Sequence, residues 1–246
     1  MSKPIILVIS LLAAVLLVIS TGCTVTQVEG SGNLTSKTFD NGDFTRVEAA
    51  NGIQLELSFS SSYSINITAD DNVMEYIEVR KSGNTLKVKP KVNTAFRSAT
   101  MIAKITMPHL LQLELSGGSE AYITGFHSSD DLSVRLSGGS RINGFITPSD
   151  ITVANANFDL SGGSRVRLIG SVDGGVSIYC SGGSRIELGD FSMNNADVNL
   201  SGGSHATVNV SGTLNVDISG GSEIIYIGNP NMGDINVAWD SSLIKQ

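Results

Sequence analysis

The tetrapeptide Ser-Gly-Gly-Ser occurs six times in this chain, and this repeat constrains the fold more than any other feature. The copies begin at Ser116, Ser137, Ser161, Ser181, Ser201 and Ser219, at intervals of 21, 24, 20, 20 and 18 residues. Repeats with periods of ~20 to 50 residues are typical of solenoids. A unit this short does not bury an apolar face alone, so the copies are expected to stack on one another.

The segments around each copy have the periodicity of β-strands. Apolar residues occupy every second position before a copy, as at Leu111, Leu113 and Leu115, and the alternation resumes after it, as at Val166 and Leu168. A period of two indicates strands with one buried face. Each unit is therefore predicted to be a strand, a tight turn, a second strand and a looser turn. The predicted fold class is all-β: a single-stranded parallel β-helix, right-handed from the usual sense of parallel crossovers.

The glycine pairs have a structural interpretation. Adjacent glycines tolerate positive φ and let the chain change direction sharply. The flanking serines are expected to hydrogen-bond nearby backbone groups or one another along the stack. A phosphate-binding interpretation is disfavoured, because neither Lys-Ser nor Lys-Thr nor a predicted helix follows the glycines. The predicted turn residues are Gly117, Gly118, Gly138, Gly139, Gly162, Gly163, Gly182, Gly183, Gly202, Gly203, Gly220 and Gly221.

The first 22 residues have the pattern of an export signal. Lys3 precedes an uncharged apolar run, and Cys23 follows the small residues Ser20 and Gly22. One interpretation is a lipoprotein signal, with lipid attached to Cys23. The alternative is an uncleaved transmembrane segment over residues 4–22, close to the ~20 residues that span a bilayer. Both place the remainder in the cell envelope, outside the cytoplasm and held at the membrane.

Composition divides the rest of the chain into four parts. Residues 23–38 are rich in Thr, Ser and Gly and are predicted to be a linker. Residues 39–110 are expected to form irregular N-terminal rungs and a cap, since an open β-helix end needs cover. Residues 111–228 hold the repeats, and residues 229–246 are expected to form a C-terminal cap.

Several classes of ligand are disfavoured. The net charge is -7 and no Lys/Arg cluster stands out, so nucleic acid is not an expected partner. The three histidines lack metal-ligand spacing, and the glycine turns lack the Asp of calcium-binding β-rolls, so neither a metal nor a cofactor is expected. Cys180 takes the place of Leu or Ile in other repeats and is predicted to be a small core residue.

The residue after each tight turn is predicted to join a column of outward side chains. These residues are Glu120, Arg141, Arg165, Arg185, His205 and Glu223. Arg141, Arg165 and Arg185 would repel one another at rung spacing unless they are paired or liganded. One hypothesis is a solvated surface, neutralised by residues such as Asp159 and Glu187. The other is a ligand strip for an anionic glycan.

The chain resembles the putative auto-transporter adhesin, head GIN domain family over roughly residues 38–228. The resemblance rests on Phe44-Thr45-Arg46-Val47, Asn51-Gly52-Ile53-Gln54, Asp70-Asp71-Asn72 and the six Ser-Gly-Gly-Ser turns. The family's Gly-Ile-Asn tripeptide is here Gly52-Ile53-Gln54. The resemblance implies a β-helix like that of the pectin-lyase group, exported and surface-located. It also implies a presumed role in adhesion, without an identified active site.

The leading functional hypothesis is a membrane-anchored binding or adhesion module without catalytic residues. Its expected partner is an extracellular glycan or a surface protein. One alternative is a structural envelope scaffold without a dedicated ligand. Another is a polysaccharide lyase or hydrolase, which is disfavoured because the carboxylates lie at different offsets in each repeat and aromatic residues are few.

Overall fold

The computed structural model describes residues 26–91, 94–144 and 150–246. The predicted signal or anchor segment and Cys23 lie outside these ranges. Within them the chain is almost entirely strands and turns, with one short 3-10 helix, η1 (Met74–Tyr76). No described helix is both long and apolar enough to cross a bilayer.

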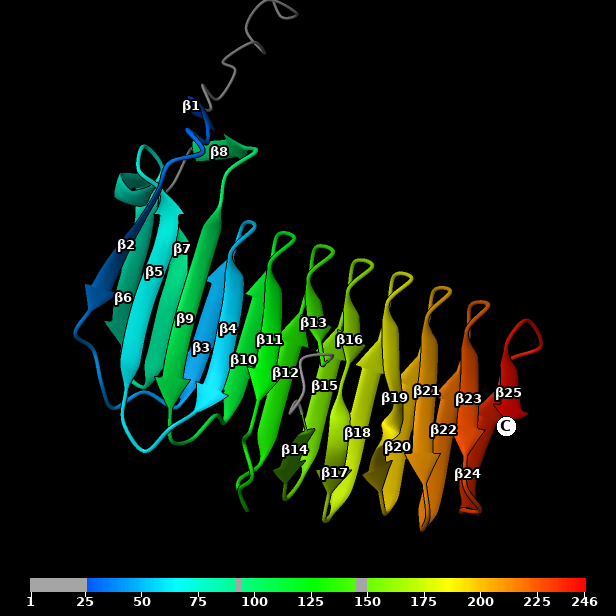
Figure 1. Ribbon diagram of the computed structural model, residues 1–246. Coiled ribbons are helices and arrows are strands. Elements are labelled where there is room, and N and C mark those ends of the chain that lie inside the picture. The colour runs from blue at the N-terminus through cyan, green and yellow to red at the C-terminus, as the bar shows by residue number, and fades with distance from the viewer. Residues whose placement is uncertain (1–25, 92–93, 145–149) are drawn as a thin grey trace, which may run out of the picture.

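Two long sheets and one small sheet hold the strands (Figure 1). The ten-stranded sheet consists of β3 (Arg46–Ala50), β6 (Ile77–Ser82), β7 (Thr85–Pro90), β10 (Gln112–Ser116), β12 (Leu132–Leu136), β15 (Ala156–Leu160), β18 (Gly175–Cys180), β20 (Asn195–Leu200), β22 (Thr213–Ile218) and β24 (Asn231–Val237). The thirteen-stranded sheet consists of β2 (Leu34–Phe39), β4 (Gln54–Phe59), β5 (Ser64–Asp70), β9 (Met101–Met107), β11 (Glu120–Thr124), β13 (Arg141–Asn143), β14 (Asp150–Val153), β16 (Arg165–Arg167), β17 (Ile169–Val172), β19 (Arg185–Met193), β21 (His205–Val210), β23 (Glu223–Ile227) and β25 (Ser242–Lys245). The small sheet pairs β1 (Thr26–Glu29) with β8 (Thr94–Arg97).

The repeats form a parallel solenoid in which each rung gives one strand to each long sheet. Like strands lie over like strands in register. Along the ten-stranded sheet, one core column consists of Leu113, Val134, Phe158, Ile178, Val198 and Val216. All six side chains are buried, and burying each one fully stabilises the fold by ~1.5 to 3 kcal/mol. The predicted β-helical fold class is confirmed, while its handedness stays a prediction.

The Ser-Gly-Gly-Ser segments form the corners that join the two sheets (Figure 1). In every corner both glycines have positive φ, between 61° and 66° at the first and between 71° and 78° at the second. The first glycines are packed closely along the column: a Cβ built on Gly162 would lie 3.1 Å from the backbone nitrogen of Gly138. The second glycines of the first five corners face open space, as at Gly163. A side chain at the first position is therefore disfavoured both by the positive φ and by close packing, and at the second position by the positive φ alone.

The two serines of a corner have different surroundings. The second serine of every corner is buried, and its Oγ donates a hydrogen bond to the backbone carbonyl oxygen of the first. In the fourth corner, Ser184 Oγ donates to Ser181 O at 2.8 Å. This bond satisfies a hydroxyl that would otherwise be buried without a partner.

We expect Ser184→Ala to lower the free energy of unfolding by ~1 kcal/mol, the usual net contribution of one such hydrogen bond. Ser181→Ala is the matched control. The Ser181 side chain is exposed, so its loss should change stability by less than ~0.5 kcal/mol. Urea unfolding followed by circular dichroism measures both, and equal losses would contradict this role for the second serine.

The column of corners continues beyond the repeat at both ends. β3 aligns with β10 and β4 with β11, so Asn51 and Gly52 occupy glycine positions. Their φ values are 58° and 82°, and asparagine is one of the few residues that tolerate this conformation. Residues 229–246, expected to form a cap, add one further rung. β24 pairs with β22 and β25 with β23, joined by the segment 238–241.

The chain covers the other end of the stack with antiparallel strands. β6 pairs antiparallel with β7, which is the last parallel strand of the ten-stranded sheet on this side. β5 pairs antiparallel with β9, and β2 pairs antiparallel with the other edge of β5. These strands are hydrogen-bonded to edges that would otherwise be open.

Candidate functional site

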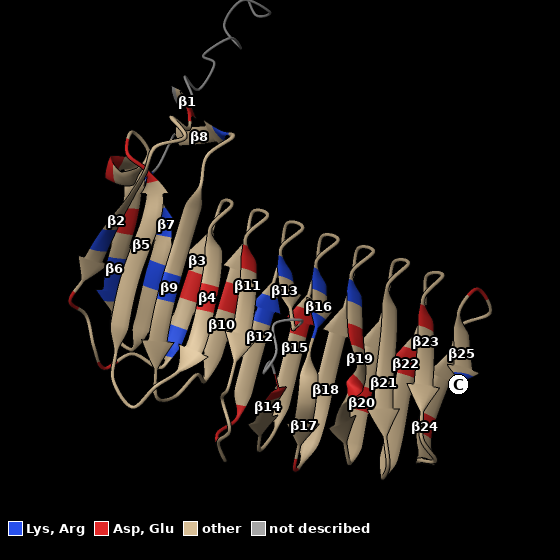
Figure 2. Cartoon of the chain, viewed as in Figure 1, with Lys and Arg blue, Asp and Glu red and all other residues tan. Residues whose placement is uncertain are grey.

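The outer surface of the thirteen-stranded sheet carries a column of arginines. Arg141 lies beside Arg165, and Arg165 beside Arg185, in the parallel register of β13, β16 and β19. All three side chains are exposed. Figure 2 shows the three blue segments side by side at the start of these strands. Adjacent strands are ~4.8 Å apart, so the column presents a regularly spaced series of cations. We call Arg141, Arg165 and Arg185 the arginine column.

Acidic residues bound the arginine column and partly neutralise it. Glu120 precedes Arg141 in the same register, and His205 and then Glu223 follow Arg185. Glu187 lies 4.0 Å from Arg185 and 3.8 Å from Arg167, whose guanidinium also lies 3.8 Å from Asp190. In the described part of the chain, Arg141 and Arg165 have no ion pair. Repulsion along the column is therefore only partly relieved by the protein itself.

Asp159 does not neutralise this column, contrary to the hypothesis from the sequence. It lies on β15 in the ten-stranded sheet, in register with Arg135 and Tyr179. This outer column consists of Glu114, Arg135, Asp159, Tyr179, Asn199 and Asp217. A shallow depression lined by the last four of these and by corner serines follows its C-terminal half. The two sheets thus present different polar surfaces.

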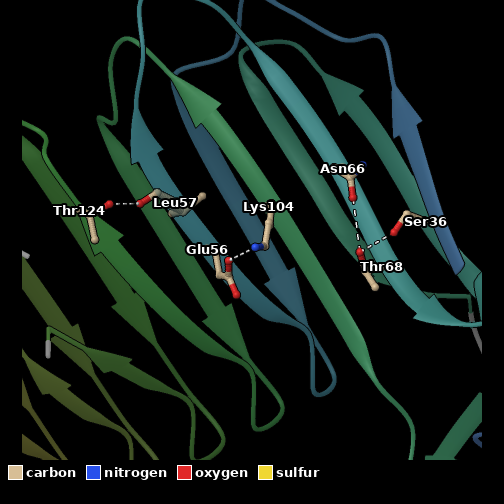
Figure 3. Close-up of polar contacts among 7 residues, drawn as sticks. All are labelled: Ser36, Glu56, Leu57, Asn66, Thr68, Lys104 and Thr124. Atoms are coloured by element: carbon tan, nitrogen blue, oxygen red, sulfur yellow. Dashed lines mark hydrogen bonds and ion pairs between the residues drawn. The ribbon is translucent and has the colours of Figure 1, made fainter. Parts of the chain in front are cut away.

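A larger groove of about 460 Å³ lies on the thirteen-stranded sheet before the arginine column. Strands β4, β5, β9 and β11 form it. Lys104 and Glu56 make an ion pair of 3.1 Å within it, and Asn66 and Tyr122 contribute further polar groups to its lining. Figure 3 shows this pair, and Thr124 directed to the carbonyl of Leu57. The sequence contained no signal for this groove, because most of its lining residues come from segments that precede the first repeat.

The three histidines have different neighbours. His109 Nδ1 lies 2.7 Å from the carboxylate of Asp130, and His127 Nδ1 lies 3.2 Å from the hydroxyl of Thr152. His205 lies next to Arg185 on β21. Among the described residues, no three His, Cys, Asp or Glu side chains are grouped as metal ligands.

Cys180 is buried in the core at the end of β18, where its register neighbours are Leu160 and Leu200. Burial, with a smaller contribution from the charge of Asp159, raises the pKa of its thiol to about 12. The thiolate, which is the reactive form, is therefore almost absent at neutral pH.

We expect Cys180 in the folded chain to resist iodoacetamide at pH 8 and to react once the chain is unfolded in urea. Peptide mass spectrometry of the alkylated residue measures this. The high folded-state pKa disfavours the thiolate while the fold persists, so raising the pH to 9 should produce little further labelling. Rapid labelling of the native chain would contradict the buried position.

The sequence pattern of the putative auto-transporter adhesin, head GIN domain family matches residues 43–230. The chain belongs to this family. Membership places this head GIN domain among surface adhesion-like modules. No curated protein matches it significantly.

Solved structures share the fold of this head GIN domain. A putative adhesin from Bacteroides fragilis has 20% identity and a TM-score of 0.70, covering 89% of this chain and 96% of its own. A putative adhesin from Parabacteroides distasonis has 16% identity and a TM-score of 0.70, covering 89% and 97%. A putative lipid binding protein from the same species has 19% identity and a TM-score of 0.63, covering 90% and 100%. At these identities the similarity establishes the fold alone.

Proposed function

We propose that this head GIN domain is an exported, membrane-anchored, non-enzymatic module that binds an acidic extracellular glycan through the arginine column. The observation that carries the proposal is the strict register of Arg141, Arg165 and Arg185 on adjacent strands. An acidic polysaccharide carries anionic groups at regular intervals along its length. Such a polymer, lying across the strands, would place its charges opposite successive guanidinium groups.

The rigidity of the scaffold supports this proposal. Each arginine follows a buried serine and precedes a core residue, as Arg165 follows Ser164 and precedes Val166. The strand backbone is therefore held from both sides, and only the side chain is free to adapt. Guanidinium groups bind carboxylates and sulfates in a two-pronged geometry that lysine does not provide. Prior alignment of three of them reduces the entropy lost on binding.

Membrane anchoring is part of the proposed function. The apolar segment before Cys23 would export the chain, and either lipid on Cys23 or an uncleaved segment would hold it at the membrane. The solenoid would then present its polar surfaces outside the cell. A surface glycan or a surface protein carrying acidic sugars is the corresponding partner.

The triple variant Arg141→Ala, Arg165→Ala, Arg185→Ala tests the ligand. Each exposed charge pair contributes up to ~1 kcal/mol, so we expect affinity for an acidic polysaccharide such as alginate to fall about 100-fold. Biolayer interferometry on immobilised polysaccharide measures this. Binding to the original chain should also weaken as salt rises.

The matched control is Lys37→Ala, Arg80→Ala, Lys91→Ala, which removes the same charge from exposed positions away from the column. We expect this control to retain binding within about threefold, because these side chains lie outside the column and screening limits their effect. If the two triple variants bound the acidic polysaccharide with equal affinity, the arginine column would not be the binding site. Absence of binding by the original chain to acidic glycans would favour the structural scaffold instead.

A further inference from the structure

The groove on the thirteen-stranded sheet has a lining whose charges cancel. It crosses the adjacent strands β5, β9, β4 and β11, so it is ~14 Å long. Its volume of about 460 Å³ lies within the ~300 to 1,000 Å³ that is usual for sites of small ligands. Glu56 and Lys104 are the charged residues of its lining, and they form an ion pair of 3.1 Å. The groove therefore favours a ligand without net charge.

Two rows of polar side chains run along this groove. The strand register places four larger polar residues in the first row: Asn66, Lys104, Glu56 and Tyr122. It places four hydroxyl-bearing residues in the second row: Ser64, Thr106, Ser58 and Thr124. Figure 3 shows Asn66, Lys104 and Glu56 on neighbouring strands. The rows are two residues apart along each strand, ~7 Å, so a ring that lies between them would contact both.

Several polar groups of the lining are available to a ligand. In the described part of the chain, the hydroxyl groups of Ser58, Ser64 and Tyr122 have no hydrogen-bond partner. Asn66 accepts a hydrogen bond from Thr68 through Oδ1, at 3.4 Å, which leaves its amide NH₂ group as a donor. The side chains of the ion pair also remain accessible, with Lys104 63% exposed and Glu56 34%. The groove thus offers donors and acceptors side by side.

We propose that this groove binds an uncharged sugar residue of a glycan. Each sugar hydroxyl both donates and accepts hydrogen bonds, which matches Lys104 and Asn66 as donors and Glu56 as an acceptor. A phosphate or carboxylate in the groove would be repelled by Glu56, and an ammonium group would be repelled by Lys104. Tyr122, at one end of the first row, provides an aromatic surface for the apolar C–H face of the sugar ring.

The groove lies beside the arginine column, and this position gives it a role that rests on the proposed function. Tyr122 lies two residues after Glu120 on β11, and Glu120 is in register with Arg141. Both sites are therefore on the outer surface of the same sheet. A glycan with an uncharged sugar next to its acidic sugars would contact the groove and the column together, and linked contacts of this kind raise affinity.

Ligand-observed NMR titrations of the full chain, in a detergent without a sugar head group, test the groove. The probes are uncharged tetrasaccharides of glucose, galactose, mannose and N-acetylglucosamine. We expect at least one of them to bind with a Kd below ~1 mM. Failure of all the probes to bind in this range would overturn the proposal.

Tyr122→Ala and Glu56→Ala should each weaken binding of that tetrasaccharide by about tenfold, because one removes the aromatic surface and the other a charged acceptor. The matched controls are Tyr179→Ala and Glu114→Ala, which remove the same side chains from exposed positions on the ten-stranded sheet. Both controls should retain the affinity within about twofold. Circular dichroism verifies that each variant is folded. Equal losses in the groove variants and the controls would also overturn the proposal.

The alginate measurement separates this proposal from the proposed function. The triple arginine variant should bind the uncharged tetrasaccharide as the original chain does. Tyr122→Ala should retain affinity for alginate, whose sugars are all acidic, within about threefold. Alginate binding without tetrasaccharide binding would overturn the groove proposal alone. Tetrasaccharide binding without alginate binding would overturn the arginine column alone.

Discussion

Replacing Gly162 by valine is expected to lower the free energy of unfolding by about 4 kcal/mol. The φ of +63° is strained for a β-branched residue, at a cost of ~1 to 3 kcal/mol. The new Cβ would also lie 3.1 Å from the backbone nitrogen of Gly138 in the preceding corner. Backbone within a stacked column yields little, so overpacking adds ~1 to 3 kcal/mol. Urea unfolding measures the total.

Gly163→Asn is the control for this prediction. Gly163 has a φ of +76°, but nothing lies within 4 Å of a Cβ built there. Asparagine tolerates left-handed backbone, as Asn51 does in the first corner. We therefore expect a loss of less than ~1 kcal/mol. If both substitutions cost the same, the close approach between successive corners is not part of what stabilises the column.

Replacing Asp70 by alanine is expected to cost about 3 kcal/mol. The Asp70 carboxylate is 1% exposed and accepts hydrogen bonds from the backbone N–H groups of Gly32, at 2.6 Å, and Thr100, at 2.7 Å. Hydrogen bonds to a charged group contribute ~1.5 to 3 kcal/mol each. Their loss would leave two N–H groups without a partner and would release the segment that leads into β2.

Asp71→Ala tests whether position 70 is specific. Asp71 is exposed and accepts hydrogen bonds from Ser31 Oγ and from its own neighbour Asn72. Its loss should cost less than ~1 kcal/mol. Hydrogen exchange at the amides of Gly32 and Thr100 should accelerate in the Asp70 variant alone. Protection that survives in that variant would contradict the role of the buried carboxylate.

The fold of the repeats was predictable from the sequence because each rung repeats the same pattern of apolar residues and turn residues. Alternation of apolar residues specified which side of each strand is buried, and the glycine pairs specified where the chain turns. Once Arg141, Arg165 and Arg185 follow equivalent corners, stacking alone brings them side by side. The arginine column was therefore predictable without knowledge of tertiary structure.

The N-terminal third was less predictable because it departs from the repeat. Asn51-Gly52 forms a corner without serines. Its equivalence to the Ser-Gly-Gly-Ser corners was visible only in the register of β3 with β10. The groove around Glu56 and Lys104 depends on pairing between β4 and β9, which are separated by an excursion through β5 to β8. Asp159 was expected to help neutralise the arginine column, but it precedes its corner and therefore lies in the other sheet.

The exposure of apolar residues on the last rung was also not predicted from the sequence. Met232, Ile235 and Val237 continue the apolar pattern of earlier strands, but among the described strands only β22 pairs with β24. Periodicity reports which residues point inward and not whether the next rung is present. The exposed end was visible only when the strand order was known.

Pulsed electron paramagnetic resonance on pairs of spin labels tests the in-register stack most directly. One label replaces Glu114, and the second replaces Asn199, Asp217 or Asn236 in turn, in a chain with Cys23→Ser and Cys180→Ala. These positions share one column, four, five and six rungs from Glu114. The stack predicts that the distance grows by ~4.8 Å for each added rung, from ~19 Å upward. Distances that do not increase in equal steps, as antiparallel hairpins would give, would contradict the solenoid and the arginine column with it.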